Sequence, residues 1–179
     1  MSIEILAKQG RGRIYGGLAA VETNKLRQMR NNSMRSCFQH FDEAKDRMEY
    51  VARIHGKEFI NDASATTVNA AWYALKNTEG HLIWIAQGND SECDYAMLRP
   101  LALRKVMMLI CVGKDNSNLH NSFQGLVPEI VDVETIGEAV NRACYCNIDM
   151  AKVIYSPATS TGINNLQAGT DFRHEVNEL

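Results

Sequence analysis

The stretch His81-Leu82-Ile83-Trp84-Ile85-Ala86 and the stretch VMMLICV at residues 106–112 decide the fold. Each is a nearly continuous apolar run of strand length, and the runs end at Gly88 and Gly113. A strand that is apolar on both faces must be covered on both faces, which is typical of a parallel sheet between two layers of helices. The two stretches therefore predict an α/β fold.

Helix and strand patterns alternate on either side of these two strands. Two short apolar runs flank His55-Gly56-Lys57, which predicts a β-hairpin or a tight strand–turn–strand. Strands are also expected at residues 129–133 and 151–155. Helical spacing occurs at residues 68–76, at 95–105 with an interruption at Pro100, at 118–123 and 136–146, and in a polar stretch that runs to residue 179. The alternation predicts that residues 48–179 form one Rossmann-like domain with a mostly parallel, open sheet and helices on both faces.

The first 47 residues differ from the rest in pattern and charge. Apolar residues recur at helical spacing before and after Asn31-Asn32-Ser33, so residues 1–47 are predicted to form a helical lead-in. Residues 1–53 hold ten Lys and Arg against six Asp and Glu, and the remainder holds nine against fifteen. This basic segment leaves a nucleic-acid partner open, but the lack of interleaved aromatic residues favours a solvated helical face.

Composition narrows the class of protein. The chain has 179 residues, of which 45% are hydrophobic and 22% charged, enough for one domain with an apolar core. No apolar run approaches the ~18–20 residues that span a bilayer, and no signal-peptide pattern is present, so we expect a cytoplasmic protein with no membrane partner. Five cysteines without a C-x-x-C pair indicate reduced thiols, and the scattered histidines predict no metal site.

Common catalytic motifs are missing from this sequence. The glycines near residues 10–16 do not match the dinucleotide fingerprint, and the phosphate-loop spacing at Gly12 and Gly17 is followed by Leu18. No nucleophile elbow occurs either. Patterns alone therefore predict no catalytic residue. In an open α/β sheet the ligand binds beyond the carboxyl ends of the strands, so we expect the binding face to be built from residues 61–67, 87–90, 113–116 and 156–160.

Three of these loops carry motifs that resemble the carboxy-terminal domain of the Mur ligases. The motifs are FINDASAT at residues 59–66, IWIAQG at residues 83–88 and SPATS at residues 156–160. The segment DRMEYV at residues 46–51 also resembles the start of that domain, and residues 10–20 resemble the end of the family's central domain. The likeness covers essentially the whole chain in unbroken order and is strongest to the branch that adds D-glutamate.

The resemblance implies a domain of an ATP-dependent ligase of peptidoglycan synthesis. Its substrates would be UDP-N-acetylmuramoyl-L-alanine and D-glutamate, and its cofactors ATP and magnesium. The family's phosphate loop and magnesium-binding acids belong to the central domain, so we expect this chain to be inactive in isolation and to hold no cofactor tightly. Whether a separate chain supplies the central domain stays open.

The resemblance extends to individual residues. Arg47 and Asp62 match an arginine and an aspartate that contact the nucleotide, and Thr66 and Ser160 match hydroxyl positions near the incoming amino acid. Read without the family, Arg47 and Asp62 suggest an ion pair and a turn cap, and Thr66 and Ser160 suggest helix caps. Both interpretations remain open at this point.

The departures from the family pattern concern polar and charged positions. Two lysines of the family are Ser64 and Ser91 here, and a His-Asn pair and a later asparagine are Gly12-Arg13 and Gly16. Each lost charge-assisted hydrogen bond is worth ~1.5–3 kcal/mol, so D-glutamate is expected to bind weakly. These losses favour the alternative hypothesis, a non-catalytic scaffold or regulatory module that keeps only the fold.

Overall fold

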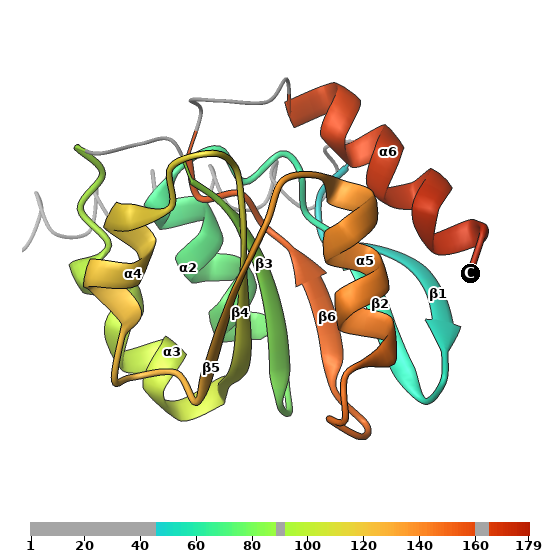
Figure 1. The fold of residues 1–179 in the computed structure, drawn as a ribbon, viewed down its shortest axis with the longest axis horizontal. Helices are drawn as coiled ribbons and strands as arrows, with labels where there is room; N and C mark the ends of the chain where they lie inside the picture. Colours follow the sequence, from blue (N-terminus) through green and yellow to red (C-terminus); the bar gives the residue numbers. More distant parts are fainter. Residues whose placement is uncertain (1–45, 89–91, 160–164) are drawn as a thin grey trace, which may run out of the picture. The chain divides into compact units, whose positions relative to one another are not determined.

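The computed structural model describes residues 46–88, 92–159 and 165–179 (Figure 1). The chain divides into two units, Met1–Glu43 and Ala44–Leu179, and all described residues belong to the second. The predicted helical lead-in lies outside the described residues apart from Asp46 and Arg47. The predicted domain boundary at residue 48 stays a prediction.

Six strands and five α-helices form the described part of the chain. The strands are β1 (Glu49–Ile54), β2 (Lys57–Asn61), β3 (Leu82–Gln87), β4 (Val106–Val112), β5 (Glu129–Val133) and β6 (Lys152–Tyr155). The helices are α2 (Val68–Asn77), α3 (Arg99–Lys105), α4 (Ser117–Phe123), α5 (Ile136–Tyr145) and α6 (Asn165–Asn177), and a 3-10 turn, η1 (Ala96–Leu98), precedes α3.

The strands form one open sheet in the order β1-β2-β6-β3-β4-β5. All neighbouring strands are parallel except β1, which pairs antiparallel with β2. The predicted α/β fold with a mostly parallel sheet is therefore confirmed. The predicted hairpin is β1–β2, and its two turn residues, His55 and Gly56, both have positive φ (48° and 80°), as tight two-residue hairpins favour. Strand β6, the last of the described strands along the sequence, lies between β2 and β3.

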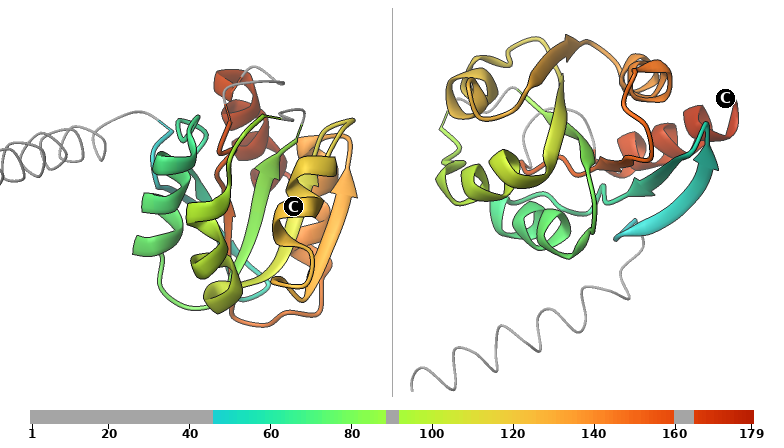
Figure 2. Two further views of the ribbon diagram at one scale, coloured as in Figure 1. Left: turned by 90° about the vertical axis from the view of Figure 1, so that its left-hand side faces the viewer. Right: turned by 90° about the horizontal axis from the view of Figure 1, so that it is seen from below.

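Two apolar cores lie on opposite faces of the sheet. Helices α2, α3 and α4 cover one face, and α5 and α6 cover the other (Figures 1 and 2). Strand β3 shows how the sequence specifies this, because Leu82 and Trp84 join the first core while Ile83 and Ile85 join the second. Successive side chains of a strand point to opposite faces, so a continuous apolar run serves both cores.

Two lysine side chains bind carbonyl oxygens at the carboxyl ends of helices α5 and α2. Buried Lys57, at the start of β2, donates from Nζ to the carbonyls of Cys144 (2.7 Å) and Cys146 (2.8 Å) at the end of α5. Lys105 donates in the same way to the carbonyls of Leu75, Lys76 and Thr78 at the end of α2. An ammonium at a helix carboxyl end satisfies orphan carbonyls and complements the helix dipole.

The helical spacing predicted at residues 95–105, which Pro100 interrupts, corresponds to two elements. The chain forms η1 first, and α3 begins at Arg99. Pro100 sits in the first turn of α3, where a missing N–H costs nothing, so the proline sets the start of the helix. In the described ranges, no helix is long and apolar enough to cross a membrane. The four described cysteines are free thiols.

Candidate functional site

The loops that follow β2, β6, β3 and β4 meet at one edge of the sheet. Backbone hydrogen bonds join neighbouring loops in that order: Asp62 N–H to the Tyr155 carbonyl (2.8 Å), Ala158 N–H to the Ala65 carbonyl (2.9 Å), Gln87 N–H to the Pro157 carbonyl (3.2 Å) and Gly88 N–H to the Val112 carbonyl (2.9 Å). The sheet therefore brings together the loops that the sequence pointed to, at the edge where α/β sheets bind ligands.

Gly88 allows the loops after β3 and β4 to approach each other closely. A Cβ at this position would lie 2.0 Å from Asn116 Oδ1 and 2.5 Å from the carbonyl oxygen of Asp115. No side chain fits at such distances, so residue 88 must be glycine for the two loops to pack as they do.

Arg47 and Asp62 form a buried ion pair at the end of β2. Both side chains are fully buried, and Arg47 Nε lies 3.7 Å from Asp62 Oδ1. Asp62 Oδ1 also accepts a hydrogen bond from the backbone N–H of Met48 (3.2 Å), and Asp62 Oδ2 accepts one from the hydroxyl of Ser156 (3.0 Å). Asp62 thus ties together the chain before β1, the end of β2 and the loop after β6.

Burial dominates the protonation of Asp62. It raises the pKa of this carboxyl from 3.8 to about 6, against the opposing effects of Arg47 and of the hydrogen bonds from Ser156 and Met48. The Arg47 guanidinium also lies over the ring of Tyr73, 5.8 Å from its centroid. The pair is therefore a charged element inside the protein, placed at the edge where the loops meet.

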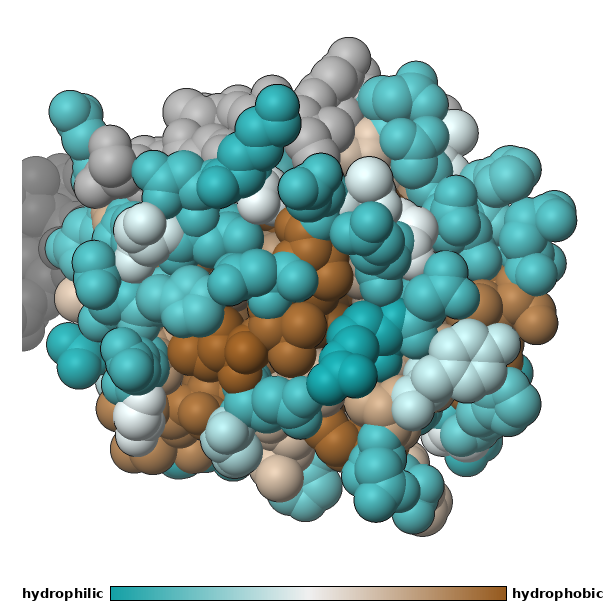
Figure 3. Space-filling view, viewed as in Figure 1, coloured by the Kyte–Doolittle hydropathy of each residue, from teal (hydrophilic) through white to brown (hydrophobic). Residues whose placement is uncertain are grey.

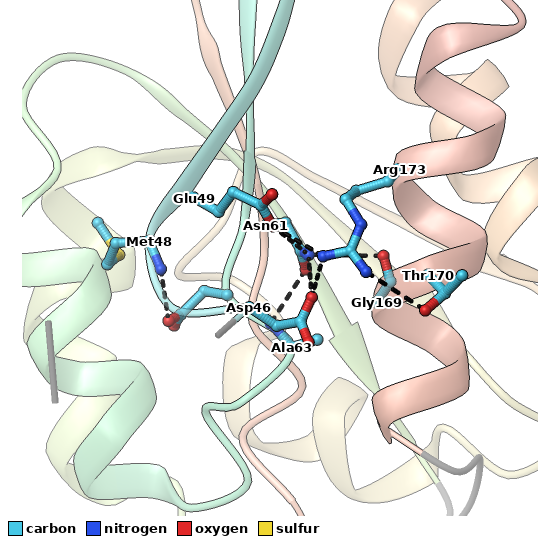
Figure 4. A network of polar contacts seen from close by, with 9 residues as sticks. Asp46, Met48, Glu49, Asn61, Ala63, Gly169, Thr170 and Arg173 are labelled. Atoms are coloured by element: carbon cyan, nitrogen blue, oxygen red, sulfur yellow. Dashed lines mark hydrogen bonds and ion pairs between the residues drawn. The ribbon is translucent and has the colours of Figure 1, made fainter. Parts of the chain in front are cut away.

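A second polar network lies beside this pair and holds α6 against the first two strands (Figure 4). Arg173 donates to the carboxylates of Asp46 and Glu49, the latter at 2.9 Å. Asn61 donates to the same two carboxylates at 3.0 and 3.1 Å. None of these side chains was a predicted site residue, because they contact one another across 12–127 residues.

Of the two predicted amino-acid-binding hydroxyls, only Thr66 is described. Thr66 is half-buried in the loop after β2, and the N-cap of α2 is Thr67, whose side chain accepts from the N–H of Ala70. The alternative interpretation of Thr66 as a helix cap is therefore wrong. Ser160 lies outside the described residues, as does Ser91.

Three buried polar atoms in these loops lack hydrogen-bond partners within the described ranges. They are Ser64 Oγ, Gln87 Oε1 and Asn116 Oδ1. Gln87 uses its other amide atom, Nε2, to donate to the Tyr155 hydroxyl at 2.8 Å. A buried polar atom without a partner costs about 1–3 kcal/mol of folding free energy, so a polar ligand that bonds to it would recover part of that cost. Ser64 is also one of the two positions where the resembled family has lysine.

A separate cluster lies at the carboxyl ends of β4 and β5, beside the loop at residues 113–116 that was predicted to form part of the binding face; none of its three side chains was a predicted site residue. Cys111, His120 and Asp132 come together beside a cavity of about 770 Å³. His120 Nε2 lies 3.0 Å from Asp132 Oδ1, and burial, with a smaller effect of Asp132, raises the pKa of Cys111 to about 12. Their spacing matches no metal or catalytic motif, so only the pairing of β4 with β5 could have revealed them.

Curated relatives match the chain over its whole length. The UDP-N-acetylmuramoylalanine–D-glutamate ligase of Porphyromonas gingivalis is 35% identical to it, over 100% of this chain and 40% of the relative. The ligase of the same name from Christiangramia forsetii is 33% identical over 97% of the chain and 40% of the relative, and that from Bacteroides fragilis is 32% identical over 90% and 36%. The chain thus spans about two fifths of the length of these relatives.

Solved structures share the fold at low sequence identity. A UDP-N-acetylmuramate–alanine ligase of Thermotoga maritima has a TM-score of 0.50 and a murein peptide ligase of Psychrobacter arcticus one of 0.52. Each is 12% identical and covers 75% of this chain and 30% of the other. No protein-family model matches the chain. The relatives that match this chain from end to end, together with the shared fold, show that the chain is a domain of the Mur ligase family.

Proposed function

We propose that the chain is the carboxy-terminal domain of a D-glutamate-adding Mur ligase of peptidoglycan synthesis, and that it acts in the cytoplasm. The observation that supports this proposal is that the chain, over nearly all of its own length, is similar to ligases named for that reaction. In this proposal ATP, with magnesium, supplies the phosphoryl group that activates the carboxylate of UDP-N-acetylmuramoyl-L-alanine. This domain holds D-glutamate and part of the nucleotide in position for reaction.

In this proposal each predicted residue has one task. Arg47 and Asp62 contact the nucleotide, the first through its guanidinium and the second through an oxygen that accepts hydroxyl hydrogen bonds. Thr66 and Ser160 hold the incoming amino acid. Two observations support a ligand at this edge: Thr66 is not used to cap α2, and buried Ser64 Oγ and Gln87 Oε1 have no partners within the described ranges.

A second function, the non-catalytic scaffold, is favoured by a different observation. The Arg47 and Asp62 side chains are fully buried and paired with each other, and Asp62 is further satisfied by Met48 and Ser156. A pair in that state holds the loop whether or not a nucleotide binds. The serines at positions 64 and 91 remove the cations that a dianionic amino acid would need.

Calorimetric titration of the full chain with ADP, ATP–magnesium and D-glutamate distinguishes the two functions. The test variant is Asp62→Asn, which keeps the shape of the side chain, whereas alanine would leave the Met48 N–H and the Ser156 hydroxyl without their acceptor. The matched control is Asp149→Asn, which removes a charge in the exposed turn before β6. This turn lies at the amino ends of the parallel strands, away from the loops of the candidate site.

Nucleotide binding that is lost in Asp62→Asn and kept in Asp149→Asn supports the ligase domain. No heat with any of the three ligands supports the scaffold. Thermal unfolding of both variants checks that each remains folded. We also expect no ATP hydrolysis by the chain alone, because its sequence contains no phosphate loop. Phosphate release above the no-protein control that Asp62→Asn abolishes would contradict that expectation.

A further inference from the structure

Three side chains of different chemistry converge at the carboxyl ends of β4 and β5. Cys111 on β4 is the register partner of Asp132 on β5, so their side chains share one face of the sheet. Helix α4 connects these two strands on the same face and brings His120 over them. The Cys111 Sγ, a His120 ring nitrogen and an Asp132 carboxylate oxygen all lie within 4.8 Å of one another.

The three side chains run from the interior to the surface. Cys111 is fully buried, the His120 side chain is 35% exposed and the Asp132 side chain is 56% exposed. His120 and Asp132 border the cavity of about 770 Å³, which is lined chiefly by the loop at residues 113–117 and by the end of β5. Protein therefore encloses the cluster on the Cys111 side and leaves it open on the other.

Asn116 orients the acidic member of the cluster. Its Nδ2 donates to Asp132 Oδ1 (2.9 Å) and to the carbonyls of Cys111 and Gly113 (both 3.2 Å). Asn116 is only 8% exposed, so a surface carboxylate is held by a buried amide. Outer hydrogen bonds of this kind are typical of residues that orient metal ligands.

We propose that Cys111, His120 and Asp132 form a Zn²⁺ site with a fourth position open to the cavity. One sulfur, one imidazole nitrogen and one carboxylate oxygen are donors that Zn²⁺ accepts together, whereas a thiolate disfavours Mg²⁺ and Ca²⁺. Zinc–ligand distances of ~2.0–2.3 Å require ligand atoms about 3–4 Å apart. His120 and Asp132 lie at the surface and can close on Cys111, whose thiol proton passes to solvent when the metal binds. The site involves no residue of the proposed ligase site and stands independently of it.

Titration of the full chain, kept reduced, with Co²⁺ tests the site directly. A thiolate-bound Co²⁺ gives a charge-transfer band in the near ultraviolet, and we expect Zn²⁺ to abolish that band by competition. We also expect Zn²⁺ alone to raise the thermal unfolding midpoint. These readouts need no enzymatic activity.

Variants assign the band to residues. Cys111→Ser removes the band, but Cys111 is packed in the core, so His120→Gln and Asp132→Asn at the surface give the same test with less disturbance of the fold. We expect both to lose the band and the Zn²⁺-dependent stabilisation. Asn116→Ala is expected to keep the band with affinity about 10–100-fold weaker, because it removes only the orienting amide.

Cys146→Ser and His174→Gln are the matched controls. Each removes a thiol or imidazole outside the cluster and should leave the Co²⁺ band unchanged. The proposal is overturned if the unaltered chain gives no band with excess Co²⁺. It is also overturned if the band survives both His120→Gln and Asp132→Asn, or if it is lost in Cys146→Ser and kept in Cys111→Ser.

Discussion

Asp62 and Asp132 occupy equivalent places in the fold and have opposite surroundings. Each lies at the carboxyl end of a parallel strand, and each faces a side chain that can carry positive charge. Asp62 and Arg47 are fully buried and bind three segments of the chain together, whereas Asp132 and His120 are 56% and 35% exposed beside a cavity. The two carboxylates share a position on the sheet but differ in burial. The buried Asp62 carboxylate uses its oxygens to hold the chain together, whereas the exposed Asp132 carboxylate remains accessible to a ligand.

The space-filling view shows the exposed side of the same contrast. In Figure 3, apolar side chains gather between the areas that α4 and α5 occupy in Figure 1, surrounded by polar ones. This is the side of edge strand β5, whose apolar residues are only half-buried. Asp132 therefore lies on a strand that is itself only partly covered.

The largest effect is expected from Arg47→Met. This change leaves Asp62 as a buried charge without its cation, and breaking a buried pair in this way costs about 3–5 kcal/mol of unfolding free energy. Urea unfolding measures the loss at pH 8 and at pH 5. The matched control is Arg142→Met, which breaks an exposed pair with Glu129 and should cost about 0–1 kcal/mol.

The pH dependence of that loss follows from the pKa of Asp62. Its folded-state pKa of about 6 lies above the unfolded value of 3.8, so the folded protein holds the proton more tightly between these values. Stability from this group is therefore fully present below about pH 4 and is lost as the pH rises to about 6. Arg47 lowers this pKa, so Arg47→Met should extend the decline above pH 6. An equal loss at pH 5 and pH 8 would show that Asp62 is not the group left unpaired.

Gly88→Ala is expected to cost about 1–3 kcal/mol by overpacking, because the new Cβ would meet Asn116 and the Asp115 carbonyl. Gly137→Ala is the control within α5. Its Cβ would meet only the end of the Glu175 side chain at 3.0 Å, which can move, so this change should be neutral or stabilising. Urea unfolding of both variants checks the contrast. Equal midpoints would mean that the loops after β3 and β4 do not need their close approach.

Lysines at positions 64 and 91 should allow the loops near Asp62 to bind a dianionic amino acid. In the double variant Ser64→Lys, Ser91→Lys, each regained charge-assisted contact should recover roughly 1–2 kcal/mol of D-glutamate binding, or about tenfold in affinity per contact. The gain should weaken with added salt. Calorimetry or NMR titration measures it, with L-glutamate as the stereochemical control. A folded double variant that binds the two enantiomers alike would favour the scaffold.

The smallest effect is expected at the exposed pair. A double-mutant cycle with His120→Gln and Asp132→Asn, measured by urea unfolding in the presence of a chelator, should give a coupling energy below about 1 kcal/mol. A coupling near 3 kcal/mol would mean that this pair supports the fold as strongly as Arg47 and Asp62 do. The contrast between the two acids would then fail.

The strands could be predicted from the sequence because their signal is local. Residues 82–86 and 106–112 are apolar at every position or nearly so, and their short length and the glycines that follow them favour buried strands over helices. A local signal misled at Thr66, because Thr66 and Thr67 both carry a hydroxyl that can cap α2 and the structure uses Thr67. The interruption at Pro100 was visible in the sequence, and α3 begins beside it.

The candidate sites depended on information that one sequence does not carry. Arg47 and Asp62 were singled out by resemblance to a family, but that resemblance gave no sign that their side chains are buried against each other. Cys111, His120 and Asp132 are brought together by the register of β4 with β5. Register depends on packing across the whole sheet, so neither spacing nor residue type could reveal this cluster.

The central place of β6 has a consequence for the order in which the protein can fold. As the chain is synthesised, the β1–β2 hairpin and the β3–β4–β5 unit can each pair internally, but within the described sheet only residues 152–155 join them. Until that strand is made, β2 and β3 each present an unpaired edge, which invites pairing with other chains. A product truncated before residue 152 should therefore be prone to aggregation and proteolysis, because the two halves of the sheet can join only after residues 152–155 have been made.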